Sequence, residues 1–334
     1  MANYRDIHGF QIEIRSDNPS NPIDGQVWYN TTDSKLRGAA VTSVGGWATA
    51  ATMNRGKYAG AGAGASNTSA LFFGGNYPPG DNLTRETEQY DGTSWTEVGD
   101  LNTGRQNLSG NGVATSALAY GGFIPPGNTV TDITESWNNS AWTEVADLNT
   151  GRVNLGSAGV SNTSNLAIGG DTYPGSNPER PKALTESWDG TCWTEVADLN
   201  TARFVLSGAG TATSAIAFGG YDFSPNYTAK TESWNGSGWT EVADLNTARY
   251  NHAGAGASNT SALAFGGTPP VTGKAESWNG TSWSEENDLN AARADLAGDG
   301  TATSALAFSG SPPIGGQTEE WAVPFTSTRE FDLS

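Results

Sequence analysis

A segment built around a tryptophan recurs along the chain at a nearly constant interval. Five close copies read TSWTEVGDLNTGR, SAWTEVADLNTGR, TCWTEVADLNTAR, SGWTEVADLNTAR and TSWSEENDLNAAR, and a weaker copy reads GGWATAATMNRG. Successive copies are 48, 47, 51, 46 and 44 residues apart. An interval of this size predicts that each copy belongs to one repeated unit of four strands. The six tryptophans are Trp47, Trp95, Trp142, Trp193, Trp239 and Trp283.

Each unit contains the same four parts. A run of small residues such as LSGAGTA is followed by an apolar run that ends in glycine, such as AIAFGG. A loop of variable length leads to a TESW-like segment, then to a tight turn, Asp-Gly or Asn-Gly in most copies, and then to the tryptophan strand. These dipeptides favour two-residue hairpins because both turn positions need positive φ. Six copies of the apolar run predict an all-β, six-bladed β-propeller.

The two ends of the repeat region complement each other. The region begins with a tryptophan strand at Trp47 that has no preceding partner in the sequence, and it ends with TEEW at Trp321, which lacks a fourth strand. Pairing the two ends gives a last blade with three C-terminal strands and one N-terminal strand (3+1). Ring closure leaves fewer exposed sheet edges, which is the physical reason to expect it.

The order of these parts resembles the kelch repeat, in which an apolar strand closes on Gly-Gly and is followed by an aromatic residue, a tryptophan and an arginine. The resemblance covers about residues 42–323 and rests on six linked copies. It implies a kelch-like propeller. It does not imply a function, because one fold serves many roles.

The first 40 residues do not repeat. The segment NPIDGQVWYNTTDSKLRG predicts a small β-hairpin, with strand GQVWYN, turn TTDS and strand KLRG. It resembles short segments near the start of bacteriophage tail-fibre and other virion proteins, which implies attachment to a particle through Trp28 and Tyr29. We therefore divide the chain into an attachment segment (1–40), a propeller (41–323) and a C-terminal tail (324–334).

Composition narrows the classes of partner. The 334 residues carry a net charge of −18 and a single cysteine, Cys192. Strong acidity disfavours nucleic acids and anionic membranes, because both repel a negative surface. A lone cysteine excludes an internal disulfide. The opening residues lack the apolar core of a signal peptide, and no run of about 18 apolar residues predicts a membrane span.

Charged residues recur with the repeat. We interpret the arginines and glutamates as one structural ion pair per blade, because catalysis needs one asymmetric set and not six equal ones. The aspartates of the DLN segments are expected to accept backbone N–H groups in turns. The recurring residues are Arg55, Arg105, Arg152, Arg203, Arg249 and Arg293; Glu88, Glu135, Glu186, Glu232, Glu276 and Glu319; and Asp100, Asp147, Asp198, Asp244 and Asp288.

Few residues are left for catalysis. His252 aligns with Tyr58, Leu108, Leu155, Leu206 and Leu296, which favours a buried histidine over a ligand. Kelch propellers of the galactose-oxidase type need two histidines, whereas the second histidine here, His8, lies outside the repeats. We therefore expect no metal, no cofactor and no enzyme activity. Asn111 and Asp299 break the small-residue pattern of the first strand, and we expect them to line a solvated axial channel that could hold water or a cation.

The loops that precede the TESW-like segments vary most between copies. They combine prolines with aromatic side chains, which form a pre-organised surface suited to a sugar or a protein. The alternative is that these loop sequences vary between copies without any functional meaning. The candidate binding residues are Tyr77, Phe123, Tyr173, Tyr221, Phe223 and Tyr227.

We expect a bacteriophage virion structural protein: a fibre, appendage or decoration subunit made in the host cytoplasm and located in the particle. Residues 1–40 would bind other virion proteins, and the propeller would dock a protein or bind a host-surface glycan or receptor. A homo-oligomer such as a trimer fits the symmetry of fibres. Two alternatives remain open: an intracellular kelch adaptor for protein partners, and a propeller-fold carbohydrate-active enzyme.

Overall fold

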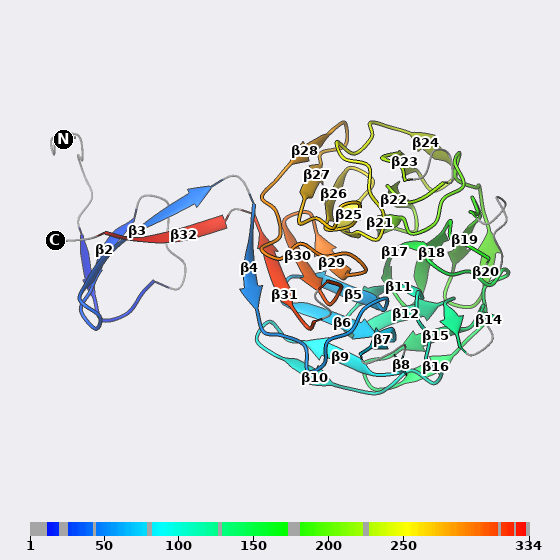
Figure 1. Ribbon diagram of the computed structural model, residues 1–334, viewed down its shortest axis with the longest axis horizontal. Coiled ribbons are helices and arrows are strands. Elements are labelled where there is room, and N and C mark those ends of the chain that lie inside the picture. The colour runs from blue at the N-terminus through cyan, green and yellow to red at the C-terminus, as the bar shows by residue number, and fades with distance from the viewer. Residues whose placement is uncertain are drawn as a thin grey trace. The chain divides into compact units, whose positions relative to one another are not determined.

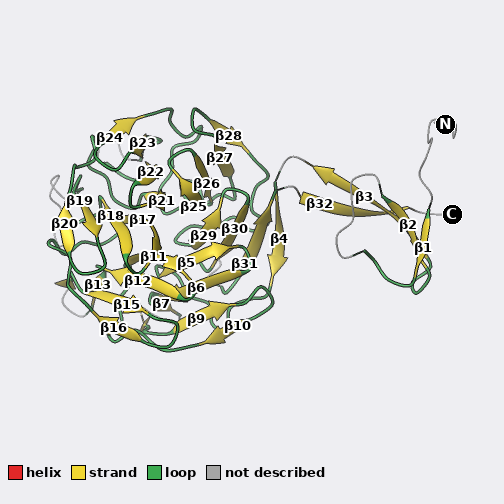
Figure 2. Ribbon diagram, turned by 180° about the vertical axis from the view of Figure 1, so that it is seen from behind, coloured by secondary structure: helices red, strands yellow, loops and turns green. Residues whose placement is uncertain are grey.

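The computed structural model describes residues 12–19, 26–42, 45–78, 82–125, 129–172, 181–222, 227–312, 315–323 and 325–331. Strands and turns make up this part of the chain, and no helix occurs in it (Figure 2). The chain divides into two compact units, one formed by residues 1–46 with 322–334 and the other by residues 47–321.

The first unit contains one four-stranded sheet in the order β1-β2-β3-β32. Its strands are β1 (Glu13–Arg15), β2 (Val27–Asn30), β3 (Lys35–Thr42) and β32 (Phe325–Phe331). β2 and β3 form the predicted antiparallel hairpin, with Trp28 opposite Arg37. β1 runs parallel to β2, and β32 pairs antiparallel with β3. The two terminal segments of the chain therefore share one sheet.

The second unit repeats a four-stranded sheet. Five of its sheets pair antiparallel throughout. Their strands are β5 (Ala61–Ser66), β6 (Ser69–Phe73), β9 (Thr87–Tyr90) and β10 (Trp95–Glu97); β11 (Ser109–Val113), β12 (Ser116–Tyr120), β15 (Thr134–Trp137) and β16 (Trp142–Glu144); β17 (Gly156–Ser161), β18 (Ser164–Ile168), β19 (Thr185–Trp188) and β20 (Trp193–Glu195); β21 (Ser207–Thr211), β22 (Ser214–Phe218), β23 (Thr231–Trp234) and β24 (Trp239–Glu241); and β25 (Ala253–Ser258), β26 (Ser261–Phe265), β27 (Ala275–Trp278) and β28 (Trp283–Glu285).

A further sheet joins strands from both ends of the repeat region. Its order is β29-β30-β31-β4, with β29 (Ala297–Thr301), β30 (Ser304–Phe308), β31 (Thr318–Ala322) and β4 (Gly46–Ala50). Trp47 on β4 lies 5.3 Å from Trp321 on β31, which matches the 5.4 Å between Trp137 and Trp142. Two short antiparallel strand pairs also occur: β7 (Asn76–Tyr77) pairs with β8 (Asn82–Leu83), and β13 (Phe123–Ile124) pairs with β14 (Thr129–Val130).

These sheets are arranged around a common axis as in a propeller (Figure 1). The first strand of each sheet lies innermost, and neighbouring inner strands contact one another in the closed order β5, β11, β17, β21, β25, β29, β5. Glycine is needed on these strands because the sheets approach closely: a Cβ on Gly110 would lie 2.4 Å from the Leu118 carbonyl oxygen and 2.7 Å from the Phe73 ring. The run of small residues therefore marks the narrow centre of the fold.

Apolar side chains from neighbouring sheets form the core. Leu166 and Ile168 on one sheet pack in the same cluster as Ala215, Ala217 and Trp234 on the next. Each outer-strand tryptophan of the five antiparallel sheets also donates its indole N–H to a threonine hydroxyl of the preceding sheet. The donor–acceptor pairs are Trp95–Thr318, Trp142–Thr87, Trp193–Thr134, Trp239–Thr185 and Trp283–Thr231.

Candidate functional site

Five of the six predicted charge pairs are buried ion pairs. The distances are 3.0 Å for Arg105–Glu135, 2.7 Å for Arg152–Glu186, 3.0 Å for Arg203–Glu232, 2.6 Å for Arg249–Glu276 and 2.6 Å for Arg293–Glu319. The other carboxylate oxygen of Glu232 accepts the backbone and side-chain N–H groups of Asn200, which follows the preceding sheet. Each pair thus holds one sheet to the next. The structural interpretation of these charges is confirmed for these five copies.

The sixth pair was predicted with the wrong cation. Arg55 is exposed and pairs with Glu86 at 2.6 Å, whereas Lys57 is buried and lies 2.7 Å from Glu88. Lys57 follows Trp47 by ten residues, as Arg105 follows Trp95, so the distance from the tryptophan sets the position. The same shift makes Gly60, and not Tyr58, the counterpart of His252.

Three of the five aspartates of the DLN segments, Asp147, Asp198 and Asp244, accept a backbone N–H group, as predicted, but from a strand and not from a local turn. Asp147 accepts from the Thr134 backbone at 3.0 Å, and Asp244 accepts from the Thr231 backbone at 3.2 Å. They therefore have a structural role in the sheet edge.

A closed ring of backbone hydrogen bonds surrounds the axis at one end of the inner strands. Each residue of the ring donates its N–H to the carbonyl oxygen of its counterpart in the neighbouring repeat, over 2.8 to 3.3 Å. All six have positive φ, between 48° and 56°. The ring runs from Ala59 to Asp295, Asn251, Val205, Asn154, Asn107 and back to Ala59. We call these six residues the mouth ring.

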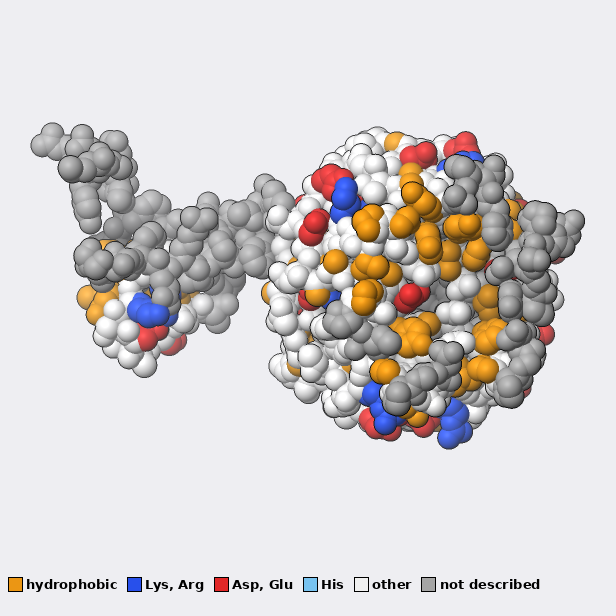
Figure 3. Space-filling model, viewed as in Figure 1, with side chains coloured by type: hydrophobic (Ala, Val, Ile, Leu, Met, Phe, Trp, Pro, Cys, Tyr) orange, Lys and Arg blue, Asp and Glu red, His pale blue; other side chains and the backbone are white. Residues whose placement is uncertain are grey.

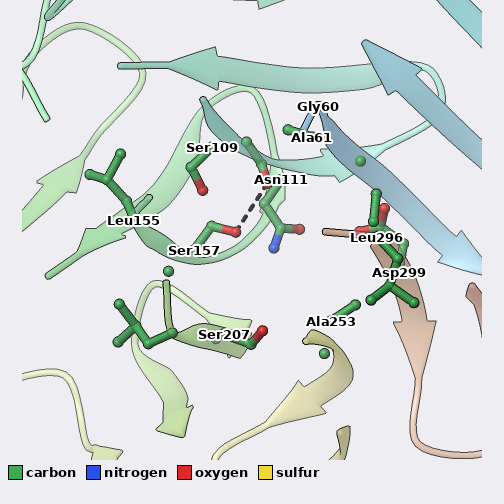
Figure 4. Close-up of a pocket in the computed structure, with 18 of the residues that line it drawn as sticks. Gly60, Ala61, Ser109, Asn111, Leu155, Ser157, Ser207, Ala253, Leu296 and Asp299 are labelled. Atoms are coloured by element: carbon green, nitrogen blue, oxygen red, sulfur yellow. Dashed lines mark hydrogen bonds between the residues drawn. The ribbon is translucent and has the colours of Figure 1, made fainter. Parts of the chain in front are cut away.

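A polar cavity lies along the axis behind the mouth ring. A pocket of about 100 Å³ at the mouth ring leads into a cavity of about 130 Å³ between the inner strands. Asn111 and Asp299 project into this cavity together with Ser157 and Ser207 (Figure 4). Ser157 donates to the Gly110 carbonyl oxygen, which lies 3.1 Å away. Asn111 and Asp299 also border a second cavity further along the axis. The channel predicted around these two residues is therefore present.

Two carboxyl groups face this channel without a cationic partner. Asp299 is 6% exposed, and its Oδ2 has no hydrogen-bond partner among the described residues. Burial raises the pKa of Asp299 well above its ordinary value, although a hydrogen bond from the Gly64 backbone opposes the shift. Burial also raises the pKa of Asp295 in the mouth ring to about 6. Both carboxyl groups therefore keep their protons to higher pH than an ordinary aspartate, because no cation among the described residues stabilises the ionised form.

His252 is a neutral wall residue of the channel. It is buried, and neither ring nitrogen forms a hydrogen bond with good geometry among the described residues. Burial and the charge of Arg249 hold the pKa of His252 well below its ordinary value, and the Phe218 backbone opposes this shift. This agrees with the expectation of a buried histidine.

The variable loops that carry the predicted aromatic residues begin beside the mouth ring. Bridges join the residue before each mouth-ring member to the start of the variable loop, for example Phe204 to Tyr221 and Tyr250 to Thr268. Tyr221 lies 5.3 Å from Phe204 and 5.8 Å from Tyr250, and Tyr227 lies 6.4 Å from Tyr250. We call Phe204, Tyr221, Tyr227 and Tyr250 the aromatic cluster. Figure 3 shows apolar side chains gathered around the centre of one face, with acidic side chains among them.

The other loop candidates are separate from this cluster. Tyr77 on β7 stacks with Arg55, whose guanidinium carbon lies 4.2 Å from the ring centroid. Phe123 begins β13 and forms a bridge with Gln106. Tyr173 and Phe223 lie outside the described residues.

The attachment candidates Trp28 and Tyr29 lie on β2 of the first unit. Trp28 is buried and donates its indole N–H to Asn18 over 3.2 Å, so it supports the sheet. Tyr29 is half-buried. Two side chains not singled out from the sequence are far more exposed in this unit: Ile12 at 54% and Ile14 at 76%.

Comparison of the chain with models of protein families and with curated proteins found no match. Among the described residues, no group of three or more histidine, cysteine, aspartate or glutamate side chains is placed to hold a metal ion. The described part also contains no helix long and apolar enough to cross a membrane.

The mouth ring and Asp295 were not predicted from the sequence. A pattern that could have predicted them exists, because the second residue after the buried cation is Asn in three copies and Asp in one. Asn and Asp adopt positive φ more readily than other residues with a side chain. Their recurrence at one position could have indicated a left-handed residue near the axis.

Proposed function

We propose that the chain is a virion structural protein of a bacteriophage, built as a six-bladed kelch-like propeller whose last blade is closed by the N-terminal strand. The observation that carries this proposal is the separation of the chain into a small terminal unit with exposed apolar side chains and a repeated unit with an aromatic face. Such a chain suits attachment at one end and recognition at the other.

Several contacts support the six-bladed, 3+1 arrangement. Asn290 donates to the Trp47 carbonyl oxygen over 3.2 Å, just as Asn246 donates to that of Trp283. Asn67 likewise donates to the Trp321 carbonyl oxygen, as Asn162 donates to that of Trp137. β4 and β31 thus make the contacts of an ordinary blade, and the mouth ring passes once through each of six repeats.

Attachment is assigned to the terminal unit because of its edge strand. β1 (Glu13–Arg15) is the outer strand of its sheet; it contains Ile14 and directly follows Ile12, and both isoleucines are exposed. An exposed apolar pair on a sheet edge offers both side chains and backbone groups to a partner strand. We therefore place the contact with other virion proteins at β1, beside the predicted residues Trp28 and Tyr29.

Recognition is assigned to the aromatic cluster. Tyr227 is 42% exposed, and the neighbouring rings are held by stacking at fixed distances. Pre-organised aromatic surfaces bind sugars and proteins with little loss of conformational entropy. A host-surface glycan or receptor is the partner that this surface fits.

The two roles can be tested separately in infected cells. Ile12→Ser combined with Ile14→Ser should reduce incorporation into particles at least about tenfold, whereas Tyr227→Ala should leave incorporation intact and reduce adsorption to host cells. Val160→Ser is the matched control, because Val160 is an apolar side chain that is 50% exposed near the end of β17 away from the mouth ring, and it belongs to neither surface. Quantitative blotting of purified particles and adsorption counts give the readouts. Absence of the wild-type chain from particles would overturn the proposal.

A further inference from the structure

The axial channel contains two acidic side chains that have no cationic partner among the described residues. Asp295 stands at its mouth and Asp299 at its inner end, and the described lining contains neither lysine nor arginine. Arg249, whose charge lowers the pKa of His252 in the channel wall, is itself paired with Glu276 at 2.6 Å, and His252 is neutral. A buried acid without a partner is costly, so the site favours a ligand that brings a positive charge.

The geometry argues for an organic cation over a metal ion. Tightly bound divalent metals take several carboxylate or imidazole ligands, and no such group exists among the described residues. The lining instead offers single acceptors at different depths, including the free Oδ2 of Asp299. An ammonium group needs only three acceptors arranged around its N–H donors.

The spacing of the two carboxyl groups sets the length of the ligand. Asp295 and Asp299 are four residues apart, and strand β29 begins between them at Ala297. Four residues of extended chain would span about 13 Å, and this is an upper limit here because Asp295 has a positive φ of 52° and the strand begins only at Ala297. Between them, Leu296 contributes to the wall of the cavity (Figure 4). A linear ligand with a cationic group at each end and an apolar middle would place its two charges at the two aspartates and its apolar part against Leu296.

We propose that the axial channel binds an alkylammonium ligand whose ammonium group is held by Asp299, and that Asp295 at the mouth holds the second ammonium group where the ligand has one. The same chemistry comes from two sources: a free linear diamine, or the side chain of a lysine inserted by a partner protein. A free diamine engages both aspartates. A lysine side chain has one ammonium group and depends on Asp299 alone.

Substitutions to asparagine test this without unfolding the protein. Asn occupies the position of Asp299 in another repeat, at Asn111, and the position of Asp295 at Asn107. The control is Asp189→Asn, which removes one exposed carboxylate from a turn where Asn138 already serves in a sibling copy. Each of the three substitutions replaces one acidic side chain by its amide counterpart.

Binding is measured by titration calorimetry on the full chain at pH 8 and constant ionic strength. The probes are α,ω-diamines of three to eight carbons, butylamine, 1,4-butanediol, Nα-acetyl-lysinamide, CaCl2 and KCl. We expect an optimum in diamine length, no binding of the diol, and a loss of at least about tenfold for Asp299→Asn and Asp295→Asn but not for Asp189→Asn.

The other outcomes are equally decisive. Binding of Nα-acetyl-lysinamide that depends on Asp299 alone, without a diamine optimum, assigns the channel to a partner's lysine. Calcium or potassium binding that depends on Asp299, with no amine binding, overturns the proposal in favour of a metal ion. Amine binding that is unchanged in all three variants also overturns it, because surface charge would then be responsible.

Discussion

The indole N–H of Trp47 lacks the acceptor that its counterparts have. In the other five repeats this group meets a threonine hydroxyl on the preceding sheet, whereas the corresponding residue for Trp47 is Ala275. A buried donor without a partner costs free energy comparable to a lost hydrogen bond. The repeat therefore carries a local defect at one position.

Ala275→Thr should repair this defect. The threonine hydroxyl would accept from Trp47 as Thr231 accepts from Trp283 over 3.2 Å, and we expect the free energy of unfolding to rise by about 1 kcal/mol. Urea denaturation followed by tryptophan fluorescence measures the change. Thr231→Ala is the reverse control and should cost about 1–2 kcal/mol. A destabilised Ala275→Thr variant would contradict the equivalence of the two positions.

Asp295 should make stability fall as the pH rises from about 4 to 6. The folded carboxyl keeps its proton up to about pH 6, whereas the ordinary value is 3.8, so the folded state binds more protons within this window. Above it the protein carries a buried charge. Asp295→Asn should remove this dependence and raise the free energy of unfolding at pH 8 by about 1–2 kcal/mol, less than the full pKa difference implies because the carboxyl is partly exposed.

The measurement is a series of urea titrations at pH 4, 5, 6, 7 and 8. Asp189→Asn provides the contrast, because hydrogen bonds from Thr191 and Cys192 lower the pKa of Asp189 to about 2. The ionised Asp189 carboxylate stabilises the folded protein above pH 4, and this contribution is lost only in stronger acid. Equal pH profiles for wild type and Asp295→Asn would show that Asp295 is not the group that titrates.

At the scale of elements, β4 is the outer strand of the sheet β29-β30-β31-β4, which combines strands from distant parts of the sequence. Trp47 on β4 packs against Phe265 at 4.9 Å and Trp321 at 5.3 Å, and Trp142 packs against Phe73 and Trp137 at nearly the same distances. A strand that arrives from the far end of the sequence therefore has the same neighbours as a strand within one repeat.

Trp47→Ala should consequently cost as much as Trp142→Ala, about 3–5 kcal/mol, and should lower the midpoint of one cooperative transition. Differential scanning calorimetry distinguishes this from a loosely added strand. In that case Trp47→Ala would cost less than about 1 kcal/mol, or a separate early transition would appear.

Repetition explains which elements were predictable. The four strands of each repeat were visible because glycine runs, turn dipeptides and tryptophans recur in register. β7, β8, β13 and β14 lie in variable loops and form only where a neighbouring bridge orders the chain, so no local pattern announces them. β1 and β32 have no repeated counterpart, and pairing between Leu36 and Phe331 spans almost the whole chain.

The candidate site was predictable only in part. Asn111 and Asp299 stood out because they interrupt a run of small residues, and the structure places both in the channel. The mouth ring depends on hydrogen bonds between repeats, which no single repeat reveals. Lys57 was missed because residue type was followed instead of distance from the tryptophan.

At the scale of the whole molecule, burial makes the surface more acidic than the composition suggests. The chain has 17 lysines and arginines against 35 aspartates and glutamates. Six of these cations are buried in ion pairs, namely Lys57, Arg105, Arg152, Arg203, Arg249 and Arg293. Their glutamates are buried as well, so outside these six pairs the sequence has 11 cations against 29 anions. Such a field attracts small cations and keeps particles or free chains apart in solution.

The mouth ring has a consequence of a different kind, because a closed loop of hydrogen bonds has no ends. A helix leaves four donors and four acceptors unpaired at its termini, whereas every N–H and carbonyl of the mouth ring that points along the loop has a partner. Gain or loss of one repeat therefore either changes the angle between neighbouring repeats at every bond of the ring or leaves one donor and one acceptor unpaired at the axis. The number of repeats is thus tied to the geometry of all six bonds together.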